Sequence, residues 1–234
     1  MAKQDLTTFM AKANLPELTD EDMVDALDNV LGPQDSLANA TTFLSFSGKT
    51  NLYSLGRDQS DMDSGDIYLM EPQSVIEGWT CWKGSKPVDR HEWSVYQAHS
   101  KAVPERELTD HGPYREQSGE GWKGMLGFGV MSTDDTPVSI QFTTTSASGR
   151  NAVKDLLQEV RSRAKAGEPA IPAMRFDREE FFAQEQRNFK PKFVVDAWLE
   201  RDAVTAHMDG ELTLAALLAG ETRATKKKRA KKRT

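Results

Sequence analysis

The chain of 234 residues is 38% hydrophobic and carries a net charge of −6, a composition typical of a globular protein with a modest apolar core. No apolar run of about 18 residues, the length that a membrane-spanning helix needs, occurs, and the single Cys81 excludes an internal disulfide bond. The residues after Met1 lack the apolar stretch of a secretory signal, so we expect a cytoplasmic protein.

Residues 1–40 form an acidic segment with a helical pattern. Thr19 is a suitable helix cap, and the acidic residues at 20–22 would follow it at the positive end of the helix. Apolar residues then recur at helical spacing until Gly32-Pro33 ends the pattern. We expect a helix that either packs on the body or offers a docking surface to a protein partner.

Residues 41–145 carry the signals of β-structure. Three hairpin turns are predicted, at residues 47–50, at Gly84-Ser85 and at residues 133–136, each between stretches rich in β-branched and aromatic residues. Residues 97–121 are polar and contain several glycines and prolines, which predicts a long loop.

A long helix is predicted after Ser148, which we expect to be its cap. Its buried face should carry five apolar residues at helical spacing, and Gly167 should end it. The members of that face are Val153, Leu156, Leu157, Val160 and Ala164. Residues 171–188 show no clear pattern, whereas residues 192–199 predict a closing strand. Because that strand is apolar on both faces, we expect it to be central in the sheet.

The predicted order of elements favours an α+β fold that is mainly antiparallel β. An OB-like barrel with one long helix and helical appendages fits this order, and a decorated β-sandwich is the alternative. We divide the chain into the acidic helical segment 1–40, a β-rich core domain 41–201, a short helical extension 202–222 and a disordered basic tail 223–234. Within the extension, residues 211–219 predict a short helix.

The sequence lacks the patterns that enzymes and metal sites require. The four histidines and one cysteine do not make a compact ligand cluster, and there is neither a nucleophile-elbow motif nor a phosphate-binding glycine loop. Asp110-His111 is adjacent in sequence, but an acid beside a histidine is unremarkable in a chain so rich in charge. We therefore expect a protein without catalytic residues, cofactor or metal.

Aromatic and basic residues alternate on the probable strands, which is the arrangement that single-strand binding needs. Flat rings stack on unpaired bases, at ~1–3 kcal/mol per base, while cations follow the phosphates. A buried tryptophan and a solubilising lysine are the ordinary interpretation of the same pattern. The predicted contact residues in the body are Trp79, Trp82, Lys83, Lys86, Arg90, Trp93, Lys123, Lys190 and Lys192.

The C-terminal tail concentrates positive charge without any apolar residue larger than Ala. Its eight basic residues are Arg223, Lys226, Lys227, Lys228, Arg229, Lys231, Lys232 and Arg233. The other 222 residues carry all 36 acidic side chains and only 22 of the 30 basic ones. Such a tail cannot bury enough surface to fold alone, so we expect a disordered arm that seeks a polyanion or folds back on the acidic body. In a eukaryotic cell it would also be typical of a nuclear-localisation signal.

Several short segments together resemble small proteins encoded by tailed bacteriophages, over residues 42 to about 200. These segments are residues 42–48, 78–83, 110–114, 121–122 and 148–153. The resemblance implies a viral setting and the cytoplasm of a host cell. The nearest functional category is the phage-type single-stranded DNA-binding protein with an OB-fold, although those proteins commonly end in an acidic tail and this chain ends in a basic one.

Two functions are consistent with these patterns. The first is a non-enzymatic single-stranded DNA-binding protein of replication or recombination. The second is a structural or protein-interaction protein, such as a virion or host-takeover component, whose basic arm contacts nucleic acid without specificity. Strand preference in the body without its tail distinguishes them, since only the first function requires it.

Overall fold

Nine strands form one sheet in the computed structural model, which describes residues 42–48, 51–55, 60–61, 65–96, 102–115, 119–133, 138–183 and 186–220. The strands are β1 Thr42–Ser47, β2 Leu52–Leu55, β3 Ser60–Asp61, β4 Tyr68–Lys83, β5 Lys86–Ser94, β6 Gly121–Ser132, β7 Ser139–Thr144, β8 Ile171–Ala183 and β9 Gln186–Leu199. The helices are the 3₁₀ turn η2 Glu105–Glu107, α3 Ala147–Lys165, α4 Arg201–Met208 and α5 Leu214–Leu218.

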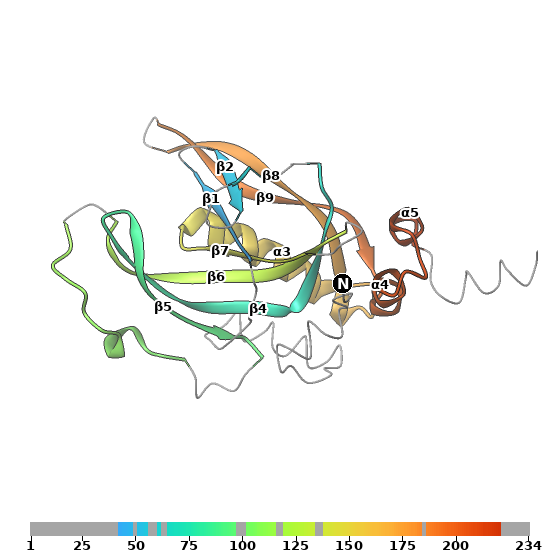
Figure 1. Ribbon diagram of the computed structural model, residues 1–234, viewed down its shortest axis with the longest axis horizontal. Coiled ribbons are helices and arrows are strands. Elements are labelled where there is room, and N and C mark those ends of the chain that lie inside the picture. Colours follow the sequence, from blue (N-terminus) through green and yellow to red (C-terminus); the bar gives the residue numbers. More distant parts are fainter. Residues whose placement is uncertain are drawn as a thin grey trace, which may run out of the picture.

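The sheet is strongly curled into a half-barrel (Figure 1). Its order is β3-β2-β1-β7-β6-β4-β8-β9, with β5 paired to β4, and only the β1–β7 pair is parallel. This confirms a largely antiparallel, barrel-like α+β fold. The strand pairing of the three predicted hairpins is also confirmed, since β1–β2, β4–β5 and β6–β7 are antiparallel pairs.

The two ends of the curled sheet meet at the β1–β2 turn. The Phe189 amide donates a hydrogen bond to the Gly48 carbonyl at 3.2 Å, and the Tyr53 hydroxyl donates to the Asp177 carbonyl at 2.6 Å. A Cβ atom at position 48 would lie 2.8 Å from the Phe189 carbonyl oxygen, so this approach requires glycine. The contact closes one end of the half-barrel.

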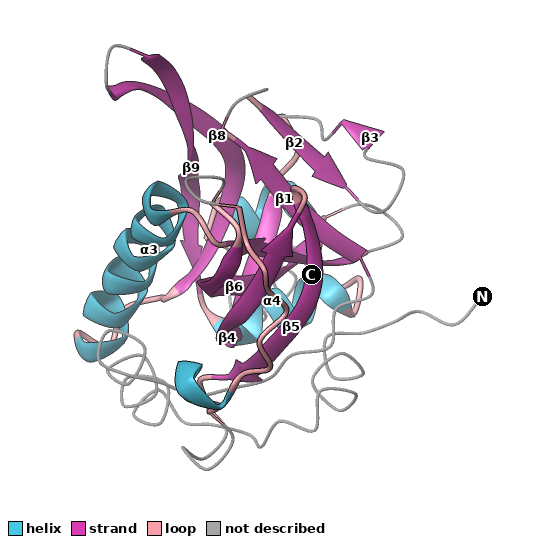
Figure 2. Ribbon diagram, turned by 90° about the vertical axis from the view of Figure 1, so that its left-hand side faces the viewer, coloured by secondary structure: helices cyan, strands magenta, loops and turns pink. Residues whose placement is uncertain are grey.

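Helix α3 covers the interior of the curled sheet with the predicted apolar face. All five predicted residues are buried, and Figure 2 shows the helix lying beside β9. Phenylalanines from four strands form an aromatic group in the same core, with most ring pairs edge-on or tilted and the Phe128–Phe176 pair stacked: Phe128, Phe142, Phe176 and Phe193. The cap is Ser146 rather than Ser148, because the Ser146 side chain accepts the Gly149 amide at 3.0 Å.

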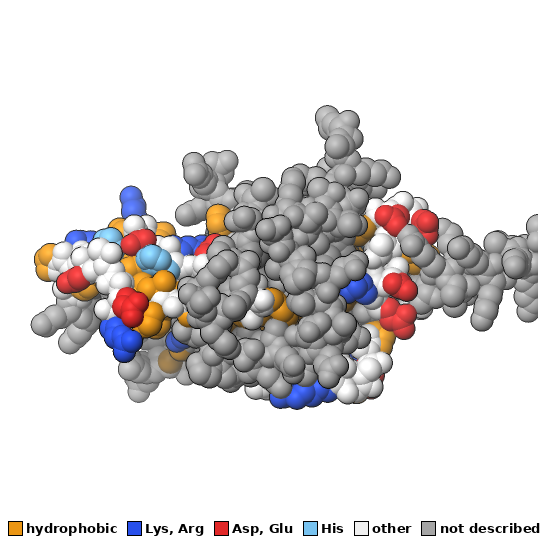
Figure 3. Space-filling model, turned by 90° about the horizontal axis from the view of Figure 1, so that it is seen from below, with side chains coloured by type: hydrophobic (Ala, Val, Ile, Leu, Met, Phe, Trp, Pro, Cys, Tyr) orange, Lys and Arg blue, Asp and Glu red, His pale blue; other side chains and the backbone are white. Residues whose placement is uncertain are grey.

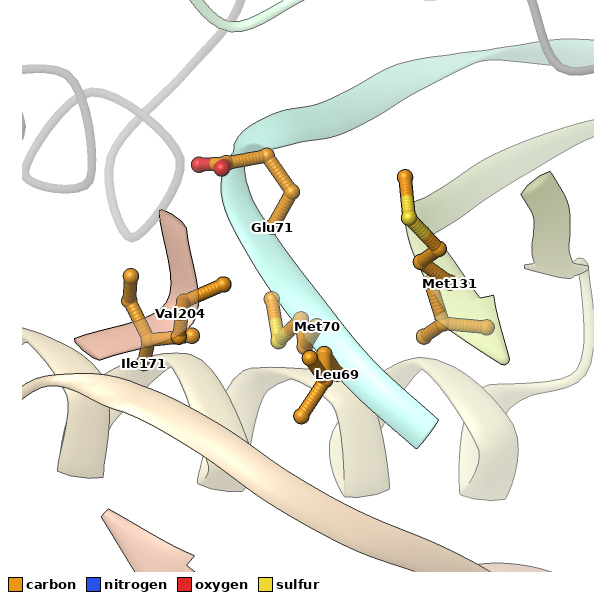
Figure 4. Close-up of a pocket in the computed structure, with 7 residues that line it drawn as sticks. Leu69, Met70, Glu71, Met131, Ile171 and Val204 are labelled. Atoms are coloured by element: carbon orange, nitrogen blue, oxygen red, sulfur yellow. The ribbon is translucent and has the colours of Figure 1, made fainter. Parts of the chain in front are cut away.

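A second apolar cluster joins α4 and α5 to the sheet. Leu69, Ile171 and Val204 meet there beside a cavity of only about 10 Å³, which has room for at most one water molecule. Figure 4 shows the Glu71 carboxylate directed away from Leu69 and Met70. That buried carboxylate accepts hydrogen bonds from the backbone amide of Gln73 at 3.0 Å and from the Arg201 guanidinium at 3.3 Å.

The β8–β9 hairpin corrects the prediction for residues 171–199. Residues 171–183 form β8, and β9 ends the sheet order instead of lying at its centre. The register shifts opposite Ala173 and Met174, where Ala197 and Val195 are their partners. This bulge changes the phase of alternation, so Phe193 and Trp198 join the α3 core while Leu199 joins the α4 cluster. The bulge therefore explains why the strand is apolar on both faces.

Two predicted segments lie outside the described residues: the acidic segment 1–40 and the basic tail 223–234. Within the predicted extension, the structure shows α4 and α5, and α5 is capped by Thr213 rather than beginning near residue 211. None of the helices in the described ranges is long and apolar enough to cross a membrane.

Candidate nucleic-acid interface

The predicted tryptophans and lysines lie mainly on a three-stranded tip of the sheet. β6 pairs with β7 only from Leu126 onward, so residues 121–125 project with β4 and β5 beyond the half-barrel. The β4–β5 turn has φ angles of 57° at Gly84 and 63° at Ser85, the left-handed conformation of a tight hairpin turn. Residues opposite each other share a face, which places Trp79 with His91 and Thr80 with Arg90 and Lys123.

One face of the tip is fastened to residues 102–115, here called the covering loop. The indole nitrogens of Trp79 and Trp122 donate hydrogen bonds to the carbonyls of Val103 and Thr109, both at 2.9 Å. The Lys83 ammonium donates to the His111 carbonyl at 2.7 Å. Trp79 and Lys83 therefore hold the loop, which explains them without a nucleic-acid ligand.

Further contacts between the covering loop and the tip surround Asp89. Its carboxylate lies 2.8 Å from Nε2 of His111 and 3.9 Å from Nε2 of His91. The hydrogen bond with His111 is the main cause that lowers the pKa of Asp89. Both imidazole rings also lie beside the Trp122 ring, with centroids 5.5 and 5.8 Å away. His111 thus pairs with a residue 22 positions away rather than with adjacent Asp110.

The hydroxyl of Tyr114 completes the contacts of the covering loop. It accepts the His111 amide at 3.0 Å and lies 3.6 Å from the Sγ atom of buried Cys81. The hydrogen bond with Cys81 raises the pKa of the Tyr114 hydroxyl. Among the described residues, no three His, Cys, Asp or Glu side chains are grouped so that they could hold a metal ion.

Two predicted contact residues are engaged elsewhere. Trp93 is only 1% exposed, so its ring belongs to the core and offers no face to a base. Arg90 forms an ion pair with Glu92, and its guanidinium lies 5.0 Å from the centre of the Phe43 ring. The alternation of aromatic and basic residues predicts binding at both positions, but Trp93 is buried and Arg90 is paired with Glu92.

Three predicted residues remain available at the tip and are called the Trp82 patch: Trp82, Lys86 and Lys123. Trp82 is half-buried and lies opposite Gly121, and its indole nitrogen is buried without a hydrogen-bond partner among the described residues. Lys86 and Lys123 are exposed and form no ion pair within the described ranges. Lys123 lies on the Trp82 face, opposite Thr80.

The tip as a whole is electrically balanced. Residues 82–92, 105–115 and 119–123 hold six basic and six acidic side chains. Figure 3 shows charged side chains of both signs beside histidine and hydrophobic groups at this end of the molecule. Any attraction of a polyanion to the tip is therefore local to the Trp82 patch.

The structure places Lys190 and Lys192 apart from this patch, on β9. β9 pairs with β8 and not with the strands of the tip, and its hairpin projects separately (Figure 1). Lys190 forms an ion pair with Glu179 at 2.9 Å, which lowers the pKa of that carboxyl group, while Lys192 is exposed. The predicted set therefore falls on two surfaces.

Sequence reasoning missed the attachment of the covering loop. Asp89, His111 and Tyr114 come together only because the loop crosses the tip, and no local pattern indicates which residues it will meet. The one available signal was the length of the polar loop itself. No known family, curated protein or solved structure matches the chain.

Proposed function

We propose that this protein binds single-stranded DNA without catalysing a reaction, in replication or recombination. The observation that supports this most directly is the Trp82 patch, where a partly exposed indole shares a face of the sheet with Lys123. Neither Lys123 nor Lys86, which follows the β4–β5 turn, has an acidic partner in the described part of the chain. Stacking on one base contributes ~1–3 kcal/mol, and each lysine neutralises one phosphate.

The basic tail provides most of the affinity in this proposal. One ring and two cations are few for a protein whose surrounding surface is electrically balanced, whereas the tail carries eight positive charges. Phosphate neutralisation is the main source of sequence-independent affinity. The patch then supplies preference for single strands, because only unpaired bases present a face for stacking.

The finer fold assignment belongs to the same proposal. Two features support an OB-like fold: the strands are curled and largely antiparallel, and a helix covers the interior of the sheet. The sheet has nine strands, whereas an OB-fold has five. The acidic segment 1–40 is the candidate site for a protein partner.

Substitution of Trp82 tests the proposal. We expect Trp82→Ala to weaken binding of an oligo-dT strand by about tenfold, the loss of one stacked base, and to remove part of the tryptophan quenching. Phe182→Ala is the matched control, since it removes an aromatic residue that is 71% exposed on the β8–β9 hairpin. Equal affinities of the two variants would remove Trp82 from the interface.

A charge reversal tests the phosphate contacts separately. Lys123→Glu should lower the magnitude of the slope of log affinity against log salt concentration by about 1, the value of one phosphate contact. Lys154→Glu, on the exposed face of α3, should leave this slope unchanged. The balanced charge of the tip favours a second candidate, a protein-interaction body with a non-specific basic arm. That candidate predicts equal binding of single and double strands in every variant.

A further inference from the structure

We propose that the groove between β9 and α3 binds an extended peptide from a partner protein, which adds a strand to the outer edge of β9. This inference goes beyond nucleic-acid binding and concerns another surface. The groove has a volume of about 420 Å³, within the range of ligand sites, and is here called the edge groove. Its lining includes Leu156, Phe181 and Phe193 as apolar residues, with charged side chains around them.

The contact between β9 and the β1–β2 turn shows which backbone amide and carbonyl groups of β9 face the outer edge of the sheet. The Phe189 amide donates to Gly48 instead of to β8, so this residue presents its backbone groups to the outer edge. In an antiparallel pair this orientation repeats every second residue, and the register is regular from residue 186 to residue 195. Pro191, Phe193 and Val195 therefore direct their backbone groups toward the edge groove.

This edge already accepts one backbone partner and has room for more. Gly48 occupies it at Phe189, whereas no further backbone hydrogen bond from the outer edge of β9 occurs among the described residues. Pro191 lacks an amide hydrogen, which is tolerated in a strand only where the amide would face away from the sheet. The carbonyl of Pro191 and both groups of Phe193 are thus available to an added strand.

Helix α3 forms the opposite side of the groove. Near its C-terminal end the helix lies close to β9, with the Arg163 guanidinium 4.6 Å from the centre of the Trp198 ring. Toward its N-terminal half, Asn151, Asp155 and Glu159 line the groove and leave space above the strand. The added strand would consequently lie between an apolar floor and a polar helical wall.

The charges of the groove favour a peptide over a nucleic acid. Asp155 and Glu159 line the helical side, and Glu179 lines the strand side with Lys190 and Lys192. Three carboxylates repel a polyanion, whereas a peptide can place a basic residue toward Asp155 and an acidic residue toward Lys192. The chain's own basic tail is a poor occupant, because it has no apolar residue larger than Ala to cover the floor.

Selection from a library of random peptides tests the inference with the full-length protein. Enriched peptides should carry apolar residues at alternate positions, and Ala152→Trp, which places a large ring in the groove, should weaken their binding at least about tenfold. Ala147→Trp at the exposed start of α3 is the matched control and should leave binding unchanged. Methylation of alternate peptide amides should abolish binding, and bound peptide should slow exchange of the Phe193 amide.

Three outcomes would overturn the inference. They are the absence of any enriched peptide, enriched peptides that bind the Ala152→Trp variant as well as the unchanged protein, and loss of oligo-dT binding in that variant. The last outcome would assign the groove to nucleic acid. Loss of oligo-dT binding only in Trp82→Ala concerns the proposed function and leaves the edge groove unaffected.

Discussion

The interior of the half-barrel and its three-stranded tip are stabilised by different means. In the interior, apolar side chains from most of the strands and from α3 form a continuous core. At the tip, indole, ammonium, imidazole and carboxylate groups attach a long loop through individual polar contacts. The interior therefore depends on packed volume, whereas the covering loop depends on a few directed bonds that can be removed one at a time.

The largest expected effect comes from the interior. Leu157→Ala should lower the free energy of unfolding by about 2–5 kcal/mol, since Leu157 is fully buried and its truncation leaves a cavity. Urea denaturation measures the change, and Gln158→Ala on the exposed face of the same helix should alter stability by less than about 0.5 kcal/mol. Similar losses in the two variants would mean that α3 does not cover the core.

Two glycines of the tip differ in how closely other atoms approach them. A Cβ atom at Gly78 would collide with the backbone carbonyl of His91, whereas the nearest atom to one at Gly124 would be the flexible end of the Arg150 side chain at 2.9 Å. Gly78→Ala should therefore cost about 1–3 kcal/mol, and Gly124→Ala clearly less, in the same denaturation measurement. Equal costs would contradict the close pairing of β4 with β5.

Asp89 tests whether directed bonds hold the covering loop. Asp89→Asn should speed amide exchange of residues 102–115 and lower the free energy of unfolding by at most about 1 kcal/mol, because the pair with His111 is partly exposed. Glu105→Gln, an exposed change in the same loop, is the control. Unchanged exchange in Asp89→Asn would show that other contacts hold the loop.

The same carboxyl group gives this attachment a pH dependence. Because its pKa in the folded protein is below the ordinary value of about 3.9, its contribution to stability is present above that value. The contribution is lost as the pH falls through the folded pKa. Urea denaturation at neutral and acidic pH should show that the free energy of unfolding falls less on acidification in Asp89→Asn than in the unchanged protein. An identical pH profile of the two proteins would contradict this assignment.

The smallest effect is expected on the β8–β9 hairpin. Arg187 forms an exposed ion pair with Glu180 at 2.7 Å and also lies 5.0 Å from the centre of the Phe189 ring. Arg187→Ala should leave the free energy of unfolding almost unchanged, as is usual for exposed pairs. A larger loss, measured by urea denaturation, would show that the hairpin contributes to the stability of the sheet.

Local patterns predicted the parts of the fold that depend on local chemistry. The five apolar residues of α3 and the Gly84-Ser85 turn follow from helical spacing and turn preference, and both were confirmed. β8 escaped prediction because its outer half, a run of four charged residues at 177–180 followed by Phe181-Phe182, lacks the period-2 alternation of a half-buried strand. The predicted position of β9 was wrong. The bulge opposite Ala173 and Met174 changes which face each side chain of β9 occupies, and the resulting sequence pattern is the same as that of a central strand with two apolar faces.

The candidate site was predicted less completely, for a related reason. Trp79, Trp82 and Trp93 look alike in sequence, yet one holds the covering loop, one is partly exposed and one is buried. Their separate environments depend on which segments cross β4 and β5, and the loop that decides this is more than 20 residues away from Trp79. Composition therefore indicated the region of the site but not its members.

A salt-dependent fluorescence titration with oligo-dT and a matched duplex, made on the full chain and on residues 1–222, tests the proposed function most directly. We predict that the truncated protein binds more weakly and with a smaller salt dependence, yet still prefers the single strand and shows tryptophan quenching. Loss of all binding with the tail, or equal binding of the two DNA forms by the truncated protein, would contradict a single-strand site in the body.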